Sequence, residues 1–168
     1  SGAGGITVAN TPTATVRLVA ANTYTGPTTI NSGTLMVGQG NPGDPGSIAS
    51  SVVNNNATLV FNRVEDLSYT GAINGTGVVT KQGAGRLVLN GTHAYTGATT
   101  VSAGTLLVNG ATGAGATTAT GGTLGGTGLI KGPVTIQSPG RLAPGTSIGT
   151  LTISNALNLS GVALMELD

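Results

Sequence analysis

The chain of 168 residues contains no cysteine and no tryptophan, and it has only one phenylalanine and three tyrosines. Without cysteine there is no disulfide framework, no thiolate metal site and no cysteine nucleophile. Only 7% of the residues are charged and the net charge is +1. Six scattered Lys and Arg residues cannot neutralise a run of phosphates, so nucleic-acid binding is excluded.

Long apolar runs are also missing. No segment approaches the roughly 20 consecutive apolar residues that a membrane-spanning helix needs, so we expect no membrane insertion by this segment. Residues 1–5 show neither the basic nor the apolar part of a signal peptide.

Small and polar residues dominate what is present. Gly, Thr, Asn and Ser account for 82 of the 168 residues, and all four favour turns or strands over helices. A helical bundle is therefore disfavoured. The hydrophobic fraction of 38% with a low net charge places the chain among folded proteins.

The chain repeats itself. Residues 24–37 and 95–108 lie 71 positions apart and are identical at nine of fourteen positions. A shorter unit, in which two β-favouring runs flank a turn of small residues, recurs at 52–61, 78–89 and 134–142. This pattern predicts an all-β fold in which short strands form stacked coils.

Recurring leucines set the expected size of a coil. They lie at positions 35, 59, 87, 106, 124 and 142, in steps of 18 to 28 residues. We therefore expect a β-solenoid of about seven coils, which at about 4.8 Å per coil would be about 35 Å long. The chain is expected to form a single domain over 1–168, with loops between coils at 41–47 and 62–68.

The repeated unit also resembles a known family. The pattern Tyr-Thr-Gly-x-Thr-Thr-Ile/Val-x-x-Gly-Thr-Leu-x-Val, present at 24–37 and 95–108, is similar to the β-strand repeat of bacterial autotransporter passenger domains. Residues 122–153 resemble the late part of such passengers. The resemblance implies a right-handed parallel β-helix that is exported and displayed outside the cell. It implies no particular activity, because the repeat serves as scaffolding in that family.

We find no catalytic, cofactor or metal site in the sequence. The five acids are expected to be solubilising surface residues: Asp44, Glu65, Asp66, Glu166 and Asp168. Adjacent strand residues point to opposite faces, so Glu65 and Asp66 do not form a catalytic pair. His93 is the only histidine, which rules out a histidine metal cluster, and we expect it to lie exposed in a turn.

Two further motifs have a structural interpretation. Residues 43–47 faintly resemble the nucleophile loop of serine proteases, but Pro45 stands where the reactive serine would be, so we interpret 40–46 as a proline-stiffened loop. Tyr24, Tyr69 and Tyr95 each precede Thr-Gly. Such rings can stack on sugars, but more often they cover the edge of the core.

Three functions stay open at this point. The leading hypothesis is a non-enzymatic, extracellular structural or adhesive module of a bacterial surface protein. The second is a subunit of a fibre that assembles end to end, through the open edges of Ile6–Val8 and Val162–Leu167. The third is a carbohydrate-binding or polysaccharide-degrading β-helix. The expected partners are other copies of the chain or the adjoining coils of a longer chain.

Overall fold

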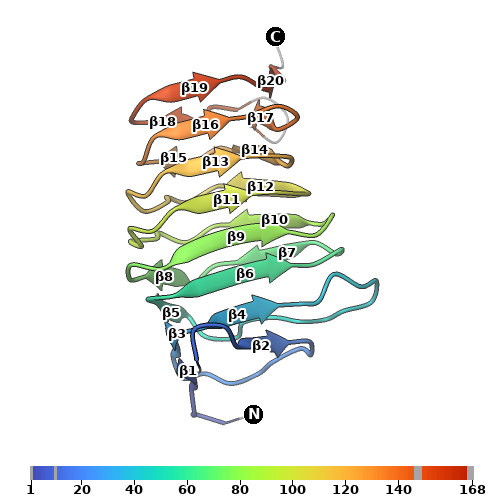
Figure 1. The fold of residues 1–168 in the computed structure, drawn as a ribbon, viewed down its shortest axis with the longest axis vertical. Coiled ribbons are helices and arrows are strands. Elements are labelled where there is room, and N and C mark those ends of the chain that lie inside the picture. Colours follow the sequence, from blue (N-terminus) through green and yellow to red (C-terminus); the bar gives the residue numbers. More distant parts are fainter. Residues whose placement is uncertain (1, 10, 146–148, 166–168) are drawn as a thin grey trace.

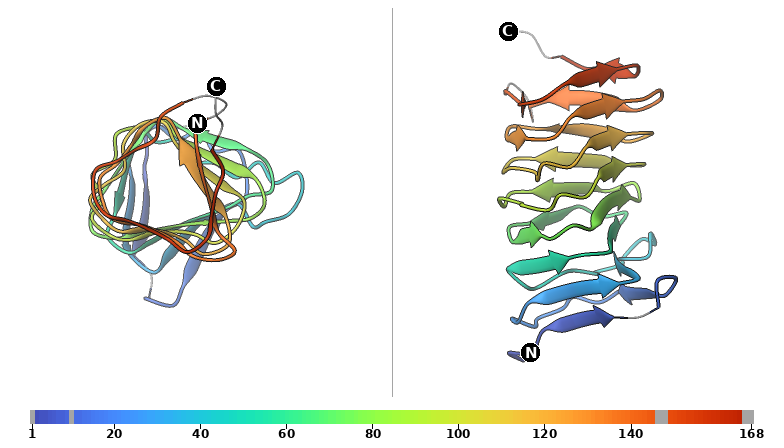
Figure 2. Two further views of the ribbon diagram at one scale, coloured as in Figure 1. Left: turned by 90° about the horizontal axis from the view of Figure 1, so that it is seen from above. Right: turned by 60° about the vertical axis from the view of Figure 1, so that its left-hand side comes forward.

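The computed structural model describes residues 2–9, 11–145 and 149–165, which form a rod of stacked coils (Figures 1 and 2). All pairs of strands run parallel, and the described residues contain no helix, and hence none that could cross a membrane. The prediction of an all-β solenoid is therefore confirmed. Seen along its axis, the rod has faces that enclose one core (Figure 2).

The strands of each face form a ladder from coil to coil. Sheet A contains β1 (Ile6–Ala9), β3 (Thr28–Ser32), β5 (Val52–Asn55) and β8 (Ala72–Asn74). Sheet B contains β2 (Thr15–Leu18), β4 (Thr34–Val37), β6 (Thr58–Asn62), β9 (Val78–Gln82), β11 (Thr99–Val101), β13 (Thr117–Ala119), β16 (Val134–Ile136) and β19 (Leu157–Leu159). Sheet C contains β7 (Leu67–Tyr69), β10 (Arg86–Leu89), β12 (Thr105–Val108), β14 (Thr123–Gly126), β17 (Arg141–Pro144) and β20 (Val162–Ala163).

Sheet D, formed by β15 (Leu129–Ile130) and β18 (Thr152–Ile153), continues the face of sheet A. Isolated bridges lead from Leu129 of sheet D to Ala111 and from Ala111 to Thr92, and the Ala94 N–H donates to the Ile73 carbonyl oxygen of sheet A at 2.9 Å. The eight strands of sheet B give eight coils, one more than the expected number of about seven. At about 4.8 Å per step, the seven steps between them span about 34 Å.

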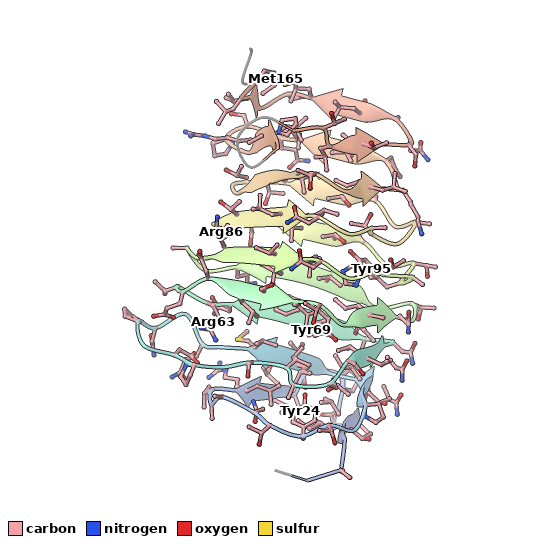
Figure 3. All side chains as sticks on the ribbon, turned by 180° about the vertical axis from the view of Figure 1, so that it is seen from behind. Tyr24, Arg63, Tyr69, Arg86, Tyr95 and Met165 are labelled. Atoms are coloured by element: carbon pink, nitrogen blue, oxygen red, sulfur yellow. The ribbon has the colours of Figure 1, made fainter. Side chains whose placement is uncertain are left out.

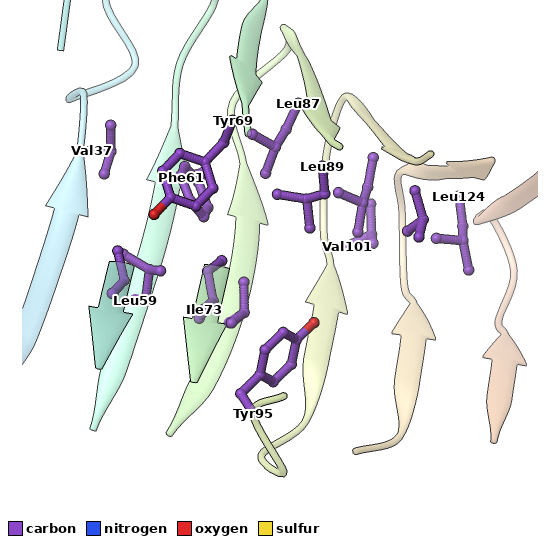
Figure 4. Packing of buried hydrophobic residues seen from close by; sticks show 14 of the residues in the cluster. Val37, Leu59, Phe61, Tyr69, Ile73, Leu87, Leu89, Tyr95, Val101 and Leu124 are labelled. Atoms are coloured by element: carbon purple, nitrogen blue, oxygen red, sulfur yellow. The ribbon is translucent and has the colours of Figure 1, made fainter. Parts of the chain in front are cut away.

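The core consists of inward-facing aliphatic columns (Figure 4). In sheet B, Leu35 lies beside Leu59 and Leu59 beside Val79. In sheet C, Leu87 lies beside Leu106, and the column continues through Leu124 and Leu142. Every one of these side chains is at most 2% exposed. One coil cannot bury such residues alone, because each needs the coil above and below it.

The leucines from which we predicted the size of a coil belong to two different columns. The step from Leu59 to Leu87 is not one coil, since Leu59 pairs with Val79 in sheet B and Leu87 pairs with Leu67 in sheet C. Both pairs close a coil after 20 residues. The physical reason is that a column accepts any apolar side chain that fills the space. The spacing of leucines alone therefore omitted Val79, the next member of the sheet B column, and counted Leu87 of sheet C in its place.

The two copies of the long repeat occupy different faces. In residues 24–37, the strands are β3 in sheet A and β4 in sheet B, whereas in residues 95–108 they are β11 in sheet B and β12 in sheet C. Their local geometry is nevertheless the same. The Tyr24 hydroxyl lies 2.7 Å from the Thr28 hydroxyl, and the Tyr95 hydroxyl lies 2.6 Å from that of Thr99. The repeat therefore specifies a corner with its two flanking strands, and not a particular face.

The connections between coils differ in length. Residues 38–51, which include the predicted loop at 41–47, connect β4 to β5 without a strand. The connection from β6 to β7 comprises residues 63–66, so it is shorter than the loop expected at 62–68, whose ends belong to the two strands.

Two columns of glycines allow the coils to approach each other at corners. One column contains Gly77, Gly97, Gly115 and Gly132, and the other contains Gly71, Gly91, Gly110 and Gly128. A Cβ atom added to any of the last three members of each column would overlap the carbonyl oxygen of the glycine one coil earlier. Close packing against backbone, and not an unusual φ angle, therefore requires glycine at these six positions.

We predict that Gly97→Ala lowers the free energy of unfolding by about 1–3 kcal/mol, because the added methyl group forces two coils apart at this corner. Thermal or urea unfolding followed by circular dichroism measures the change. Gly4→Ala is the matched control, since a Cβ atom at Gly4 has no atom within 4 Å. Equal stability of the two variants would show that the corner tolerates a side chain.

Candidate functional site

The C-terminal coil exposes side chains that would be core residues anywhere else in the rod. Leu157 and Leu159 of β19 are in register with Val134 and Ile136 of β16. The two β16 residues are completely buried, whereas the leucines are 44% and 46% exposed. The difference arises because no described coil covers β19.

An apolar patch results at this end of the rod. It comprises Leu157, Leu159, Val162, Leu164 and Met165, which are five of the seven large apolar residues that are exposed in the described part of the chain. Of these, Val162 pairs with the exposed Arg141 and therefore faces outward on sheet C. Figure 3 labels Met165 at this end of the rod. The first coil differs, since Val8 and Leu18 are only 1% and 8% exposed. The strands β18, β19 and β20 are also the last members of their sheets, so their outer backbone groups are free to pair with another strand. The C-terminal end thus has the chemistry of the coil-to-coil contacts inside the rod.

Asp44 is buried at 5% exposure, which corrects the prediction that it is a solubilising surface residue. Its carboxylate accepts hydrogen bonds from the N–H groups of Gln39, at 2.6 Å, and Gly46, at 2.8 Å. The loop of residues 38–51 folds back on itself, and its amides need acceptors that the strands do not provide. In the same loop, the Ser47 hydroxyl accepts a hydrogen bond from the N–H of Asn22 at 3.1 Å.

Glu65 and Asp66 face different coils. Glu65 accepts a hydrogen bond from the N–H of Gly43 in the preceding coil. Asp66 accepts one from the Arg86 N–H at 2.9 Å and forms an exposed ion pair with the Arg86 guanidinium at 2.8 Å. The hydrogen bond from the Arg86 backbone N–H is the main reason that the pKa of the Asp66 carboxyl is lowered. Glu166 and Asp168 lie outside the described residues, and the described part of the chain contains no cluster of three potential metal ligands.

His93 is fully buried, so the expectation of an exposed turn histidine is wrong. Its Nδ1 atom accepts a hydrogen bond from the N–H of Ile73 at 3.1 Å. Its ring lies between those of Tyr69 and Tyr95, at centroid distances of 6.5 and 6.3 Å. Burial lowers the pKa of His93 to about 4. The sequence does not indicate that His93 is buried. The face of sheet A has no regular strand at this point, so no alternation of apolar and polar residues marks position 93 as inward.

The tyrosines face the core. Tyr69 and Tyr95 are 5% and 1% exposed, and Tyr24 is half-buried. The Tyr69 hydroxyl donates to the carbonyl oxygen of Ser50 at 3.1 Å, and burial raises the pKa of both Tyr69 and Tyr95. The rings of Tyr69 and Tyr95 are therefore covered by protein and do not present a stacking surface for a sugar.

The sequence interpretation missed Lys81. This side chain is only 2% exposed and occupies the inward column of sheet B between Phe61 and Val101. Its ammonium group donates to the carbonyl oxygens of Gln82, at 2.6 Å, and of Gly83, at 2.9 Å. Burial lowers the pKa of Lys81 to about 8. The alternation through the strand was the available signal, since Lys81 follows Val79 by two positions.

Comparison with known proteins agrees with the geometry of these coils. Residues 13–37 and 79–108 match the family model described as the passenger-associated-transport-repeat. These two segments are autotransporter passenger repeats. They contain β2 to β4 in one case and β10 to β12 with nearly all of β9 in the other, so each passenger repeat takes up slightly more than one coil.

Two relatives extend this result. The chain is 45% identical over 77 residues to the adhesin BmaC autotransporter of Brucella suis biovar 1 (strain 1330), a match that covers 46% of this chain and 2% of the adhesin. It is 38% identical over 86 residues to an extracellular serine protease of Serratia marcescens, a match that covers 51% of this chain and 8% of the protease. The chain thus spans only a small part of the length of either relative. No solved structure was found to match it.

The buried lysine of the second passenger repeat gives a prediction for the dependence of stability on pH. Between pH 8 and the ordinary lysine pKa of 10.5, the unfolded chain keeps a proton that folded Lys81 has lost. The free energy of unfolding must therefore rise with pH in this window. The raised pKa values of Tyr69 and Tyr95 act in the opposite direction above about pH 10, so the rise is measured by urea unfolding between pH 7.5 and 9.5.

Lys81→Met removes the titrating group at similar length, and we expect a flatter pH profile over this range. Lys131→Met, which removes an exposed lysine, serves as the control and should keep the wild-type slope. An unchanged slope in Lys81→Met would show that Lys81 keeps its ordinary pKa in the folded protein.

Proposed function

We propose that this chain is a non-enzymatic segment of an extracellular bacterial passenger, a rigid stack of coils that spaces or presents adhesive surfaces outside the cell. The observation that carries the proposal is the exposed C-terminal coil, whose leucines continue the buried column of sheet B. Such an end is suited to receive another coil. The passenger repeats and the similarity to an adhesin support the extracellular location and the structural role.

The contacts of Asp44 and Ser47, in the loop of residues 38–51, and of Asp66, in the connection of residues 63–66, support a scaffold over an enzyme. Asp44 holds backbone amides, Asp66 joins two coils through Arg86, and Ser47 binds the backbone of Asn22. Each group is therefore engaged in holding coils or loops together. The similarity to the serine protease covers 8% of that protein, so it does not transfer the protease's activity to this segment.

The occupant that we propose for the C-terminal end is the next coil of a longer passenger. The exposed leucines lie at inward positions of a parallel strand, and the strands beside them have free backbone groups. A further parallel strand satisfies both at once. The first coil of a second copy is the other candidate, and it corresponds to the fibre hypothesis.

Sedimentation velocity of the 168-residue chain over a concentration series tests this end. We expect reversible self-association in the absence of the next coil, because the apolar patch is uncovered. Leu159→Lys should weaken the association at least tenfold while the circular dichroism spectrum stays the same, since a charge then lies on the strand edge. Val78→Lys changes a residue of similar exposure in the middle of the rod and should have no effect.

A wild-type chain that stays monomeric at all concentrations would overturn the assignment of this end as a coil-joining surface. Association that weakens equally in both variants would do the same, because a general loss of solubility would then be responsible. Electron microscopy of the associated wild type separates pairs of rods from long fibres.

The non-enzymatic assignment makes a separate prediction. We expect that a fluorophosphonate probe, which labels activated serines, does not react with the folded chain, because Ser47 is hydrogen-bonded to the backbone and the sole histidine is buried in the core. Mass spectrometry of the treated protein measures the labelling. A stoichiometric adduct on any serine, removed by Ser→Ala substitution at that position, would contradict the proposal.

A further inference from the structure

The contact between two coils on the face of sheet A has an unusual hydrogen bond. Sheet A ends at β8, and the next coil contributes residues 92–94, which form no regular strand. The Ala94 N–H still donates to the Ile73 carbonyl oxygen at 2.9 Å. The Ile73 N–H, however, donates to Nδ1 of His93 and not to a backbone carbonyl.

Sheet B shows what an ordinary contact contains. There the Val79 N–H donates to the carbonyl oxygen of Ala98 at 2.9 Å, and the Thr99 N–H donates to that of Ala116 at 2.8 Å. At Ile73, an imidazole nitrogen takes the place of the carbonyl oxygen. The joint on this face therefore depends on a group that can gain a proton, which a carbonyl oxygen does not do at ordinary pH.

The hydrogen bond fixes the protonation state of His93. Because Nδ1 accepts, the ring is neutral and carries its proton on Nε2, which is buried and has no hydrogen-bond partner. The titratable groups packed against the ring in the described structure are Tyr69, on β7, and Tyr95, which follows His93 in the chain. Both hydroxyls are neutral, and neither supplies a negative charge. Figure 4 shows Tyr69, Ile73 and Tyr95 within the core cluster.

A second proton would break the joint. It would convert Nδ1 from an acceptor to a donor, so that two N–H groups would face each other, and it would place a charge between two buried rings. The neighbouring contacts on the other two faces lack such a group, since β9 pairs with β11, and β10 with β7, through backbone hydrogen bonds. The effect should therefore be confined to one face.

We propose that His93 makes the joint between β8 and residues 92–94 an acid-sensitive hinge, at which one face of the rod opens when the imidazole is protonated. The sheets on the other two faces keep the coils in place, so acid loosens the rod locally before it unfolds. In an extracellular rod, such a hinge would couple stiffness to the acidity of the surroundings. This inference does not depend on what occupies the C-terminal end.

Amide hydrogen exchange of Ile73, measured by NMR and corrected for the intrinsic rate, tests the proposal. His93 has a pKa of about 4 in the folded protein and is assigned the ordinary value of 6.5 in the open state. Linkage between protonation and opening then predicts that exchange accelerates about 20-fold from pH 7 to pH 5. The amide of Val79, which bonds to a backbone carbonyl in sheet B, is the internal control and should change much less.

His93→Asn provides the matched variant, because the asparagine Oδ1 can accept the same N–H group but does not titrate. Its Ile73 amide should exchange at a rate that is independent of pH over this range after the same correction. A wild-type Ile73 amide that shows no acceleration, or a variant with the wild-type slope, would overturn the proposal. If the variant does not fold, the ¹⁵N shifts of His93 in the wild type still decide: they must show a neutral ring at pH 7 with an unprotonated Nδ1.

Discussion

The requirement that each coil lie flat on the next at the spacing of hydrogen-bonded strands determines most of this structure. Strand separation is about 4.8 Å, and every backbone group on a face must meet a partner at that distance. The faces meet the requirement with parallel ladders such as that of sheet B. The corners meet it by omitting side chains, so glycines at positions such as Gly97 and Gly115 stand above glycines of the preceding coil. The large share of glycine and threonine in the composition follows from this geometry.

Polar side chains enter the core where the backbone alone does not satisfy its own groups. Lys81 donates to carbonyl oxygens at a corner, His93 accepts an amide where sheet A ends, and Asp44 accepts two amides of a long loop. These groups therefore complete the hydrogen bonding of the backbone between and within coils. Their ionisation is tied to the integrity of particular joints, because changing the charge removes a donor or an acceptor. The rod is uniform in outline, but its joints differ in their response to pH.

The sequence predicts the class of fold because the spacing of small turn residues and aliphatic runs reflects the coil itself. It does not reveal the phase of each unit, by which we mean the pair of faces on which the two strands of the unit lie. The repeats at 24–37 and 95–108 have the same pattern and the same tyrosine–threonine contact, yet they occupy different pairs of faces. The length of the connections between the repeats sets this phase, and no local pattern records it. For the same reason, the burial of His93 was not predicted: its inward position depends on the register against Ile73, a residue of the preceding coil.

A repeat that can occupy any face has a consequence for how such rods grow. If a unit required one particular face, every insertion or deletion between units would disrupt the stack. Here the same corner packs between sheets A and B in one copy and between sheets B and C in the other, so connections of different length are accommodated by rotation about the axis. The condition for adding a coil is then only that the last one presents inward aliphatic residues and free strand edges. The final described coil presents Leu157 and Leu159 at such inward positions, in register with the buried Val134 and Ile136 of the coil before it.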